Sequence, residues 1–291
     1  FVIVAVALKL PAIPSLLGGV LIGVPFMFMN KASVETALVA AEASKTDVPS
    51  NIFNILNNGV SMGQLPDDAA LIKTIVTTNL ANDIAKYYNI NLFEVLTGFK
   101  YIGEKMLDFE VNHTGTYVFG FEESYGCLIG THARDKDAIV ASMALCEAAA
   151  YYKTKNMTLW DAMIAMYERY GYCKDGVKAV TMKGIEGLAK IQEIMSDLRK
   201  NPPKEINGHK VLSFRDYQAD TITDLATGEV KPTGLPKSNV LYFDMEDNVW
   251  MCVRPSGTEP KIKFYYGVVG TSLEDADKKS EQMAKAVDDL I

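Results

Sequence analysis

One loop near the end of the sequence combines side chains suited to holding a phosphate dianion. Arg254 carries a planar guanidinium that can bind two phosphate oxygens at once, and Lys261 adds a compact positive charge. Ser256 and Thr258 add hydroxyl donors two residues apart. Gly257 lies between them and tolerates positive φ, which allows backbone N–H groups to turn toward an anion. The alternative is an ordinary hairpin turn built from its usual residues.

A second loop, Gly-Phe-Glu-Glu-Ser-Tyr-Gly at residues 120–126, carries side chains that suit a sugar. Side chains alternate along an extended segment, so Glu122 and Ser124 would face one side and Glu123 the other. A carboxylate accepts hydrogen bonds from adjacent ring hydroxyls, and a serine can donate or accept a further one. The alternative is a solvated loop whose two neighbouring glutamates bind nothing.

Alternating strands and helices are predicted around the second loop. Apolar β-branched runs predict strands, and apolar residues at helical spacing predict helices. The predicted strands are 71–77, 92–96 and 116–121, and the predicted helices are 80–88, 99–109, 137–152 and 158–170. This alternation predicts a parallel sheet covered on both faces, with the loop beyond the carboxyl ends of the strands, where open sheets bind ligands. Asn79 is predicted to cap the first of these helices.

A smaller α+β domain is predicted to carry the phosphate-type loop. A hinge is predicted at residues 171–175. The predicted strands are 177–182, 211–217, 240–244, 248–253 and 262–269, and the predicted helices are 185–200 and a last helix beginning at Ser272. Asp275 follows Ser272 at capping-box spacing. We expect a mostly antiparallel sheet with helices on one face.

Composition narrows the classes of function. The 291 residues are 48% hydrophobic and 22% charged, which is typical of globular chains with about two domains. The net charge of −7 argues against a general nucleic-acid binder. The four cysteines are widely spaced, which favours a reduced intracellular compartment, and the three histidines are scattered and suggest no metal cluster. Because Phe1 is not a methionine, we expect a piece of a longer protein.

The first residues differ from the rest. Residues 10–29 carry no charge, and a run of about 20 such residues is a candidate membrane helix. The alternative is a buried helix of another domain. The segments 8–14 and 18–23 resemble part of an NhaC-type sodium/proton antiporter, and residues up to about 63 could continue that resemblance. We therefore expect residues 1–63 to be a hydrophobic, helical N-terminal segment, either fused to the remainder of the chain or unrelated to it.

Three motifs from residue 65 onward resemble the α-D-phosphohexomutases, the phosphoglucomutase/phosphomannomutase family. Arg-Pro-Ser-Gly-Thr-Glu-Pro-Lys at 254–261 is similar to that family's phosphate loop, and Gly-Phe-Glu-Glu-Ser at 120–124 to its sugar loop. Residues 131–137 and Thr-Gly-Phe-Lys at 97–100 continue the similarity. The resemblance implies that Lys100 is a basic residue near the substrate. It gives Arg134 a similar role, although Arg134 could equally pair or cap near a helix start.

The resemblance also implies an architecture and an activity. Residues 64–171 would be the third domain, a Rossmann-like three-layer α/β unit that reads the sugar and that could be truncated at its start. Residues 172–291 would be the fourth domain, an α+β unit that holds phosphate. Such enzymes are isomerases of carbohydrate metabolism that interconvert hexose 1- and 6-phosphates through a phosphoserine, a glucose 1,6-bisphosphate intermediate and bound Mg²⁺. The implied partner is a hexose phosphate, and the implied location is the cytoplasm.

Two of the family's loops have no counterpart in this sequence. No serine stands in a Thr-Ala-Ser-His-Asn-Pro-like setting, and no Asp-x-Asp-x-Asp-Arg-like metal loop is present. We therefore predict no catalytic residue and no metal ligand, and expect this chain alone to be inactive. Two alternatives stay open: a non-catalytic sugar-phosphate-binding remnant, and a fusion anchored in a membrane by residues 1–30. The preference for glucose or mannose cannot be read from these loops.

Overall fold

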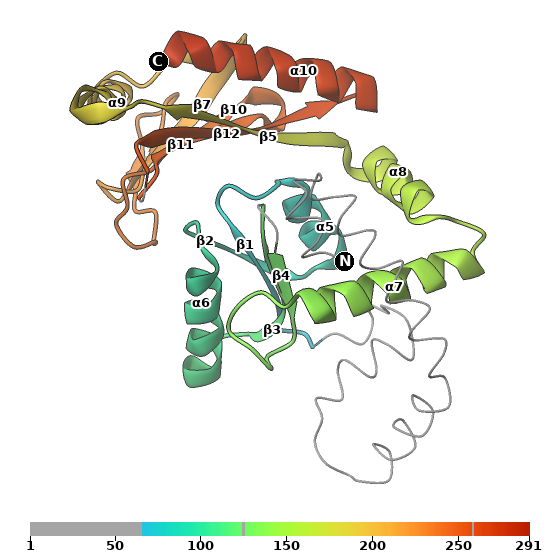
Figure 1. Ribbon diagram of the computed structural model, residues 1–291. Helices are drawn as coiled ribbons and strands as arrows, with labels where there is room; N and C mark the ends of the chain where they lie inside the picture. The colour runs from blue at the N-terminus through green and yellow to red at the C-terminus, as the bar shows by residue number, and fades with distance from the viewer. Residues whose placement is uncertain (1–65, 124–125, 258) are drawn as a thin grey trace.

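The computed structural model describes residues 66–123, 126–257 and 259–291, and the predicted N-terminal segment 1–63 lies outside them. Within this described part, no helix is both long and apolar enough to cross a membrane. The first domain contains, in chain order, β1 (Ala69–Thr74), α5 (Leu80–Tyr88), β2 (Asn91–Val95), α6 (Phe99–Asn112), β3 (Thr116–Glu122), β4 (Gly126–Ile129), α7 (Ala138–Thr154) and α8 (Leu159–Tyr170) (Figure 1).

The sheet of the first domain is mixed rather than parallel throughout. Among the described residues its strand order is β2-β1-β3-β4, with β1 parallel to both β2 and β3. β4 runs antiparallel to β3, with Glu122 opposite Gly126. The prediction of a purely parallel sheet was wrong because β4 follows β3 after only three residues, and parallel strands need a long crossover connection. The second candidate loop, residues 120–126, spans this connection.

Helix α6 covers one face of this sheet. Its residues Phe99, Ile102, Met106 and Phe109 are all buried, at the helical spacing that the sequence shows. They pack against Ala70, Ile72, Val95, Tyr117 and Leu128 from the four strands. Burying each large apolar side chain contributes roughly 1.5–3 kcal/mol, so this contact fixes α6 and the loop that precedes it.

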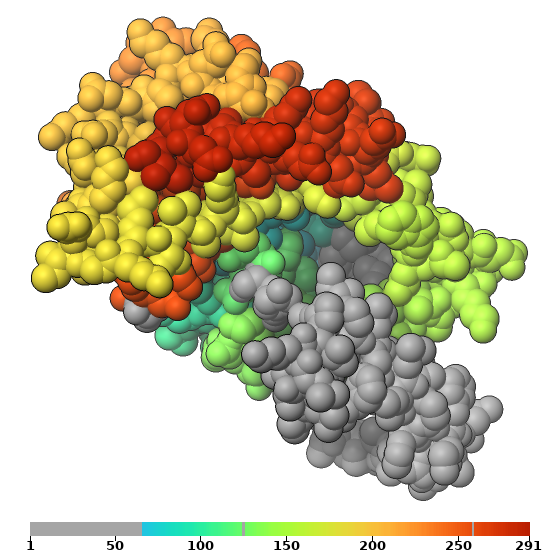
Figure 2. Space-filling model, turned by 45° about the horizontal axis from the view of Figure 1, so that its top comes forward, coloured from blue at the N-terminus to red at the C-terminus, as the bar shows by residue number. Residues whose placement is uncertain are grey.

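The second domain is an antiparallel sheet with helices on one face. It contains β5 (Tyr172–Thr181), α9 (Gly184–Lys200), β6 (Glu205–Ile206), β7 (His209–Asp216), β8 (Thr221–Asp224), β9 (Val230–Lys231), β10 (Leu241–Met245), β11 (Trp250–Pro255), β12 (Lys261–Gly270) and α10 (Leu273–Ala286). The strand order is β5-β12-β11-β10-β7-β8-β9, with β6 beside β7. Residues of α9 and α10 share one core cluster with the strands. In Figure 2 the red residues of α10 cross the outer surface of this domain.

The predicted mixed α/β architecture of residues 65–291 is confirmed.

Two local predictions were wrong. The proposed hinge at 171–175 is mostly strand, because β5 begins at Tyr172 and pairs with β12 along its length. Of these five residues, only Gly171 has the left-handed backbone of a break, with φ of 103°. Asn79 makes no side-chain capping bond to α5. Its Oδ1 instead accepts a hydrogen bond from Nζ of Lys73 at 2.9 Å. A buried ammonium without hydrogen-bond acceptors would be strongly destabilising, which favours this use of the Asn79 side chain.

The two domains meet through a shared apolar cluster. Ile75, Val76 and Leu96, at the carboxyl ends of β1 and β2, are buried. They cluster with residues on the sheet face opposite α9 and α10, namely Tyr217, Val240, Tyr242, Trp250, Cys252 and Tyr265. The carboxyl edge of the first sheet therefore lies against one face of the second sheet, below it in Figure 1.

Candidate functional site

The loop between β11 and β12 is held on a buried strand pair. Four successive residues of β11, from Trp250 to Val253, are buried, and Arg254 follows at the half-buried end of the strand. Arg254 lies opposite Lys263 of β12, and the backbone N–H of Ser256 donates to the carbonyl of Lys261 at 2.7 Å. This close return of the chain presents the loop residues at a fixed position. Thr258, a predicted phosphate donor, lies outside the described residues.

Two features of this loop bear on anion binding. The φ angle of Gly257 lies outside the left-handed region, so the positive φ that glycine tolerates is not adopted here, and the inward turn of N–H groups stays a prediction. Space around it is open, since a Cβ there would meet no atom within 4 Å. The ammonium of Lys261 lies 3.0 Å from Oε2 of Glu259 within the same loop. An incoming anion would therefore compete with Glu259 for this charge.

Arg254 lies among groups of both domains. The hydroxyl of Tyr265 is beside its guanidinium: burial raises the pKa of Tyr265, while the charge and hydrogen bond of Arg254 oppose that rise. Arg254 also acts on Glu123, which belongs to the second candidate loop. Burial raises the pKa of Glu123, and the hydroxyl of Thr74, which donates to its Oε2 at 3.1 Å, and the Arg254 charge act in the opposite direction. The charge of Arg254 therefore acts on a residue of the other candidate loop.

Glu122 at the end of β3 is held by a lysine that sequence reasoning did not single out. The carboxylate of Glu122 is largely buried, and its Oε1 lies 3.1 Å from Nζ of Lys136. The same ammonium lies over the ring of Phe99, 5.2 Å from its centroid. Lys136 lies within residues 131–137, which the sequence comparison with the family already indicated, but Arg134 rather than Lys136 was predicted as the basic residue of that stretch. Ser124, the other predicted sugar contact, lies outside the described residues.

The side chains of Lys100 and Arg134 are directed to opposite ends of α6, although the backbone of Arg134 lies beside Gly103. Lys100 is exposed in the first turn, with its ammonium 4.6 Å from the centroid of the Tyr101 ring. Arg134 pairs with Glu110 and also donates to the carbonyl of Thr131 at 3.2 Å. Glu110 is about 16 Å along the helix from Phe99 at roughly 1.5 Å per residue. The guanidinium of Arg134 is therefore directed toward the end of α6 remote from both loops, which agrees with the pairing alternative.

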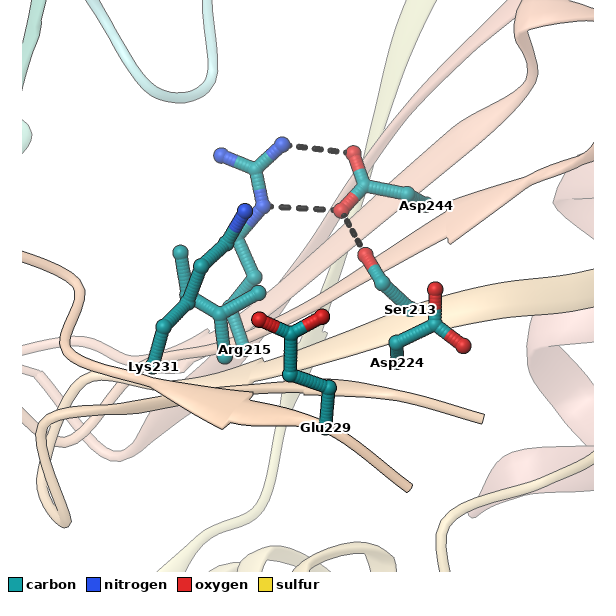
Figure 3. A pocket seen from close by; sticks show the side chains of 7 residues that line it. Ser213, Arg215, Asp224, Glu229, Lys231 and Asp244 are labelled. Carbon is teal, nitrogen blue, oxygen red and sulfur yellow. Dashed lines mark hydrogen bonds and ion pairs between the residues drawn. The ribbon is translucent and has the colours of Figure 1, made fainter. Parts of the chain in front are cut away.

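A separate hollow of about 400 Å³ lies on the second sheet. Figure 3 shows its lining, which comes from β7, β8, β9 and β10 together with the turn before β9: Ser213, Arg215, Ile222, Asp224, Glu229, Lys231 and Asp244. Arg215 binds Asp244 through Nε and Nη2, at 2.8 and 2.6 Å, and Ser213 donates to the same carboxylate at 2.5 Å. Arg215, Ser213 and Asp244 therefore bond one another, and neither candidate loop contributes to the hollow.

Metal binding has no support in the described residues. Within ranges 66–123, 126–257 and 259–291, no group of three or more His, Cys, Asp or Glu side chains is placed to hold an ion. Mg²⁺ requires several converging oxygen ligands in octahedral geometry. These residues therefore do not fit a Mg²⁺ site.

Comparisons with known proteins identify related sequences for most of this chain. Residues 49–170 match the family model described as "Phosphoglucomutase/phosphomannomutase, alpha/beta/alpha domain III". A phosphoglucomutase of Staphylococcus aureus (strain bovine RF122 / ET3-1) is 36% identical over 213 residues, covering 73% of this chain and 38% of the relative. A phosphoglucomutase of Staphylococcus epidermidis is 35% identical over 232 residues, covering 76% and 41%. The chain thus spans about two fifths of the length of the curated relatives it matches.

A solved structure shares the fold. The open form of the Paramecium exocytosis-sensitive phosphoprotein pp63/parafusin, a phosphoglucomutase, aligns with a TM-score of 0.52 and 19% identity, over 75% of this chain and 37% of that one. These matches give no support to the antiporter resemblance, and the family match begins at residue 49, inside the stretch assigned to it. The boundaries proposed at 63/64 and 171/172 stay predictions.

Proposed function

We propose that this chain is the C-terminal part of a phosphohexomutase and that it binds a hexose phosphate between its two loops. The domain III match of residues 49–170 and the staphylococcal phosphoglucomutases support this proposal. The observation that carries it is the apolar cluster in which Ile75, next to the Thr74 that donates to Glu123, packs with Cys252, two residues before Arg254. The charge of Arg254 also acts on Glu123 of the β3–β4 loop. Cationic and carboxylate groups that converge from two domains suit a ligand with a phosphate at one end and hydroxyls at the other.

The chemistry of each group sets its role in this proposal. Arg254 and Lys261 bind the phosphate. The planar guanidinium of Arg254 donates hydrogen bonds to two phosphate oxygens, and the ammonium of Lys261 exchanges its contact with Glu259 for one with the anion. Glu122, oriented by Lys136, accepts hydrogen bonds from sugar hydroxyls. Lys100, exposed at the start of α6, contributes positive charge at the same edge of the sheet.

The activity of the whole enzyme would be that of a phosphoglucomutase/phosphomannomutase, an isomerase that moves a phosphoryl group between the 1- and 6-positions. Phosphoryl transfer depends on positioning and on neutralising charge, which a bound Mg²⁺ supplies together with cationic side chains. The described residues contribute the cationic side chains and the positioning. We therefore expect this chain to bind the sugar phosphate without turning it over. A coupled assay that detects glucose 6-phosphate separates binding alone from mutase activity.

The test is calorimetric titration of glucose 1-phosphate into the full chain. We expect saturable binding that weakens by at least about tenfold in Arg254→Ala, since a charge-assisted hydrogen bond contributes roughly 1.5–3 kcal/mol. Arg134→Ala is the matched control, because its guanidinium is paired with Glu110 away from both loops. Equal affinity in wild type and Arg254→Ala would contradict the phosphate role. A loss in Arg134→Ala as large as in Arg254→Ala would contradict the placement of the site.

A further inference from the structure

A chain of charged side chains runs from the first domain into the second. Lys73, at the end of β1, is fully buried, and its ammonium lies 3.2 Å from Oε1 of Glu94 on β2. The other oxygen of Glu94, Oε2, lies 3.3 Å from Nη1 of Arg215 on β7. Arg215 in turn binds Asp244 on β10 with its Nε and Nη2. The single carboxylate of Glu94 therefore contacts one cation from each domain.

The cation of the first domain is fixed in place. Nζ of Lys73 donates to the carbonyl of Thr77 at 3.0 Å, to the carbonyl of Thr78 at 3.3 Å and to Oδ1 of Asn79 at 2.9 Å. Burial lowers the pKa of Lys73, and the charge of Glu94 opposes this. A buried ammonium with four acceptors has little freedom to follow a moving partner.

The cation of the second domain is equally constrained. Two nitrogens of Arg215 are committed to Asp244, and the guanidinium lies over the ring of Tyr242 with its carbon 4.5 Å from the centroid. Because the guanidinium is planar and two of its nitrogens are bound, the direction of its third nitrogen, Nη1, is fixed. Glu94 can meet both cations only when the two sheets adopt one relative orientation.

This bridge lies at the base of both candidate loops. Thr74, directly after Lys73, donates to Glu123 of the β3–β4 loop. Tyr242, under Arg215, pairs with Cys252 of β11, two residues before Arg254. The apolar cluster around Leu96 also joins the domains, but hydrophobic contact is non-directional and does not by itself select one orientation.

We infer that Glu94 is a positioning residue that sets the orientation of the second domain, and with it the separation between Arg254 and the β3–β4 loop. The inference rests on the proposed function, because that separation matters only if both loops bind one ligand. It assigns no chemical step to Glu94. It requires both the charge of Glu94 and the length of its side chain.

Two variants separate these requirements. Glu94→Gln keeps the length and removes the charge, whereas Glu94→Asp keeps the charge and shortens the reach. We expect both to weaken glucose 1-phosphate binding by about tenfold, the size of one charge-assisted contact. The control is Glu193→Gln, which breaks an exposed pair with Lys190 on α9, and it should bind as wild type does. Wild-type affinity in Glu94→Asp would overturn the positioning role, since charge alone would then suffice.

A second measurement does not depend on ligand. Cys252 is fully buried in the apolar cluster that the two domains share, so its alkylation by a thiol reagent, followed by mass spectrometry, reports opening of that contact. We expect alkylation to become several-fold faster in both Glu94 variants and to stay slow in Glu193→Gln. Unchanged protection of Cys252 in both variants would overturn the inference. If wild type fails to bind glucose 1-phosphate, the proposed function fails, while Cys252 protection still decides whether Glu94 holds the domains.

Discussion

The charge of Glu123 affects how strongly the candidate phosphate loop attracts an anion. Its carboxylate accepts a hydrogen bond from Thr74 and lies within the field of Arg254, while burial raises its pKa. An ionised Glu123 neutralises part of the charge that Arg254 would offer to a phosphate. The net attraction of the loop for an anion therefore depends on the protonation of Glu123 as well as on Arg254 itself.

This dependence predicts the behaviour of Glu123→Gln. Above the raised pKa of Glu123 the wild-type carboxylate is ionised and repels inorganic phosphate, so the variant should bind phosphate several-fold more tightly. As the pH falls through that pKa, wild type gains a proton and loses the repulsion, so the two affinities should converge. Titration calorimetry at a series of pH values measures the ratio. Glu186→Gln, on α9, is the control, and a ratio independent of pH would contradict the prediction.

Individual elements of the first domain differ in how they are stabilised. Helix α6 buries five residues, but among the described residues neither α7 nor α8 buries any. Helix α8 instead begins with a complete capping box: Thr158 Oγ1 accepts from the N–H of Asp161 at 3.1 Å, and Asp161 Oδ2 accepts from the N–H of Thr158 at 2.8 Å. Local end contacts therefore matter more for α8 than for α6.

Removing the cap should consequently weaken α8 selectively. We expect Thr158→Ala to lower its local stability by about 1 kcal/mol, because the first-turn N–H groups lose their acceptor. Hydrogen exchange followed by mass spectrometry should show faster exchange in α8 and unchanged exchange in α6. Thr154→Ala, at the end of α7, is the matched control. Equal effects of the two substitutions on α8 would show that the capping box does not stabilise this helix.

The whole molecule is joined across its domains by apolar and ionic contacts. Ile75, Val76 and Leu96 of the first domain share a cluster with the aromatic face of the second sheet, where Tyr242 and Trp250 stack with ring centroids 5.5 Å apart. The Glu94 bridge lies next to this cluster. A contact of this kind couples the unfolding of two domains, because neither can open without exposing part of the shared cluster.

Truncation within this cluster should separate the two domains. We expect Leu96→Ala to cost about 2–5 kcal/mol and to split the calorimetric unfolding transition into two, since the lost contact joins the domains. Ile194→Ala is the matched control: it truncates a buried residue in the core of the second domain alone. This control should lower stability without changing the number of transitions. A single transition in Leu96→Ala would argue that other contacts suffice for coupling.

The sequence by itself predicted most of the helices and the positions of the two candidate loops, whose roles stay predictions. Residues Phe99, Ile102, Met106 and Phe109 form a stripe that only a helix can bury together, and α6 follows from it. Residues 254–261 and 120–124 were found because their side-chain chemistry is local and is written in consecutive positions. The short strands β4, β6, β8 and β9 were missed, since two to four residues carry too little periodic signal.

Only the tertiary structure decided which charges meet. Lys136 rather than Arg134 lies against Glu122, because the guanidinium of Arg134 extends along α6 to Glu110. The contact of Glu94 with Arg215 joins positions 121 residues apart. Such pairings depend on how two sheets pack and on where long side chains find unsatisfied partners. Spacing along a chain specifies which face an element buries, but not which distant charge lies opposite it.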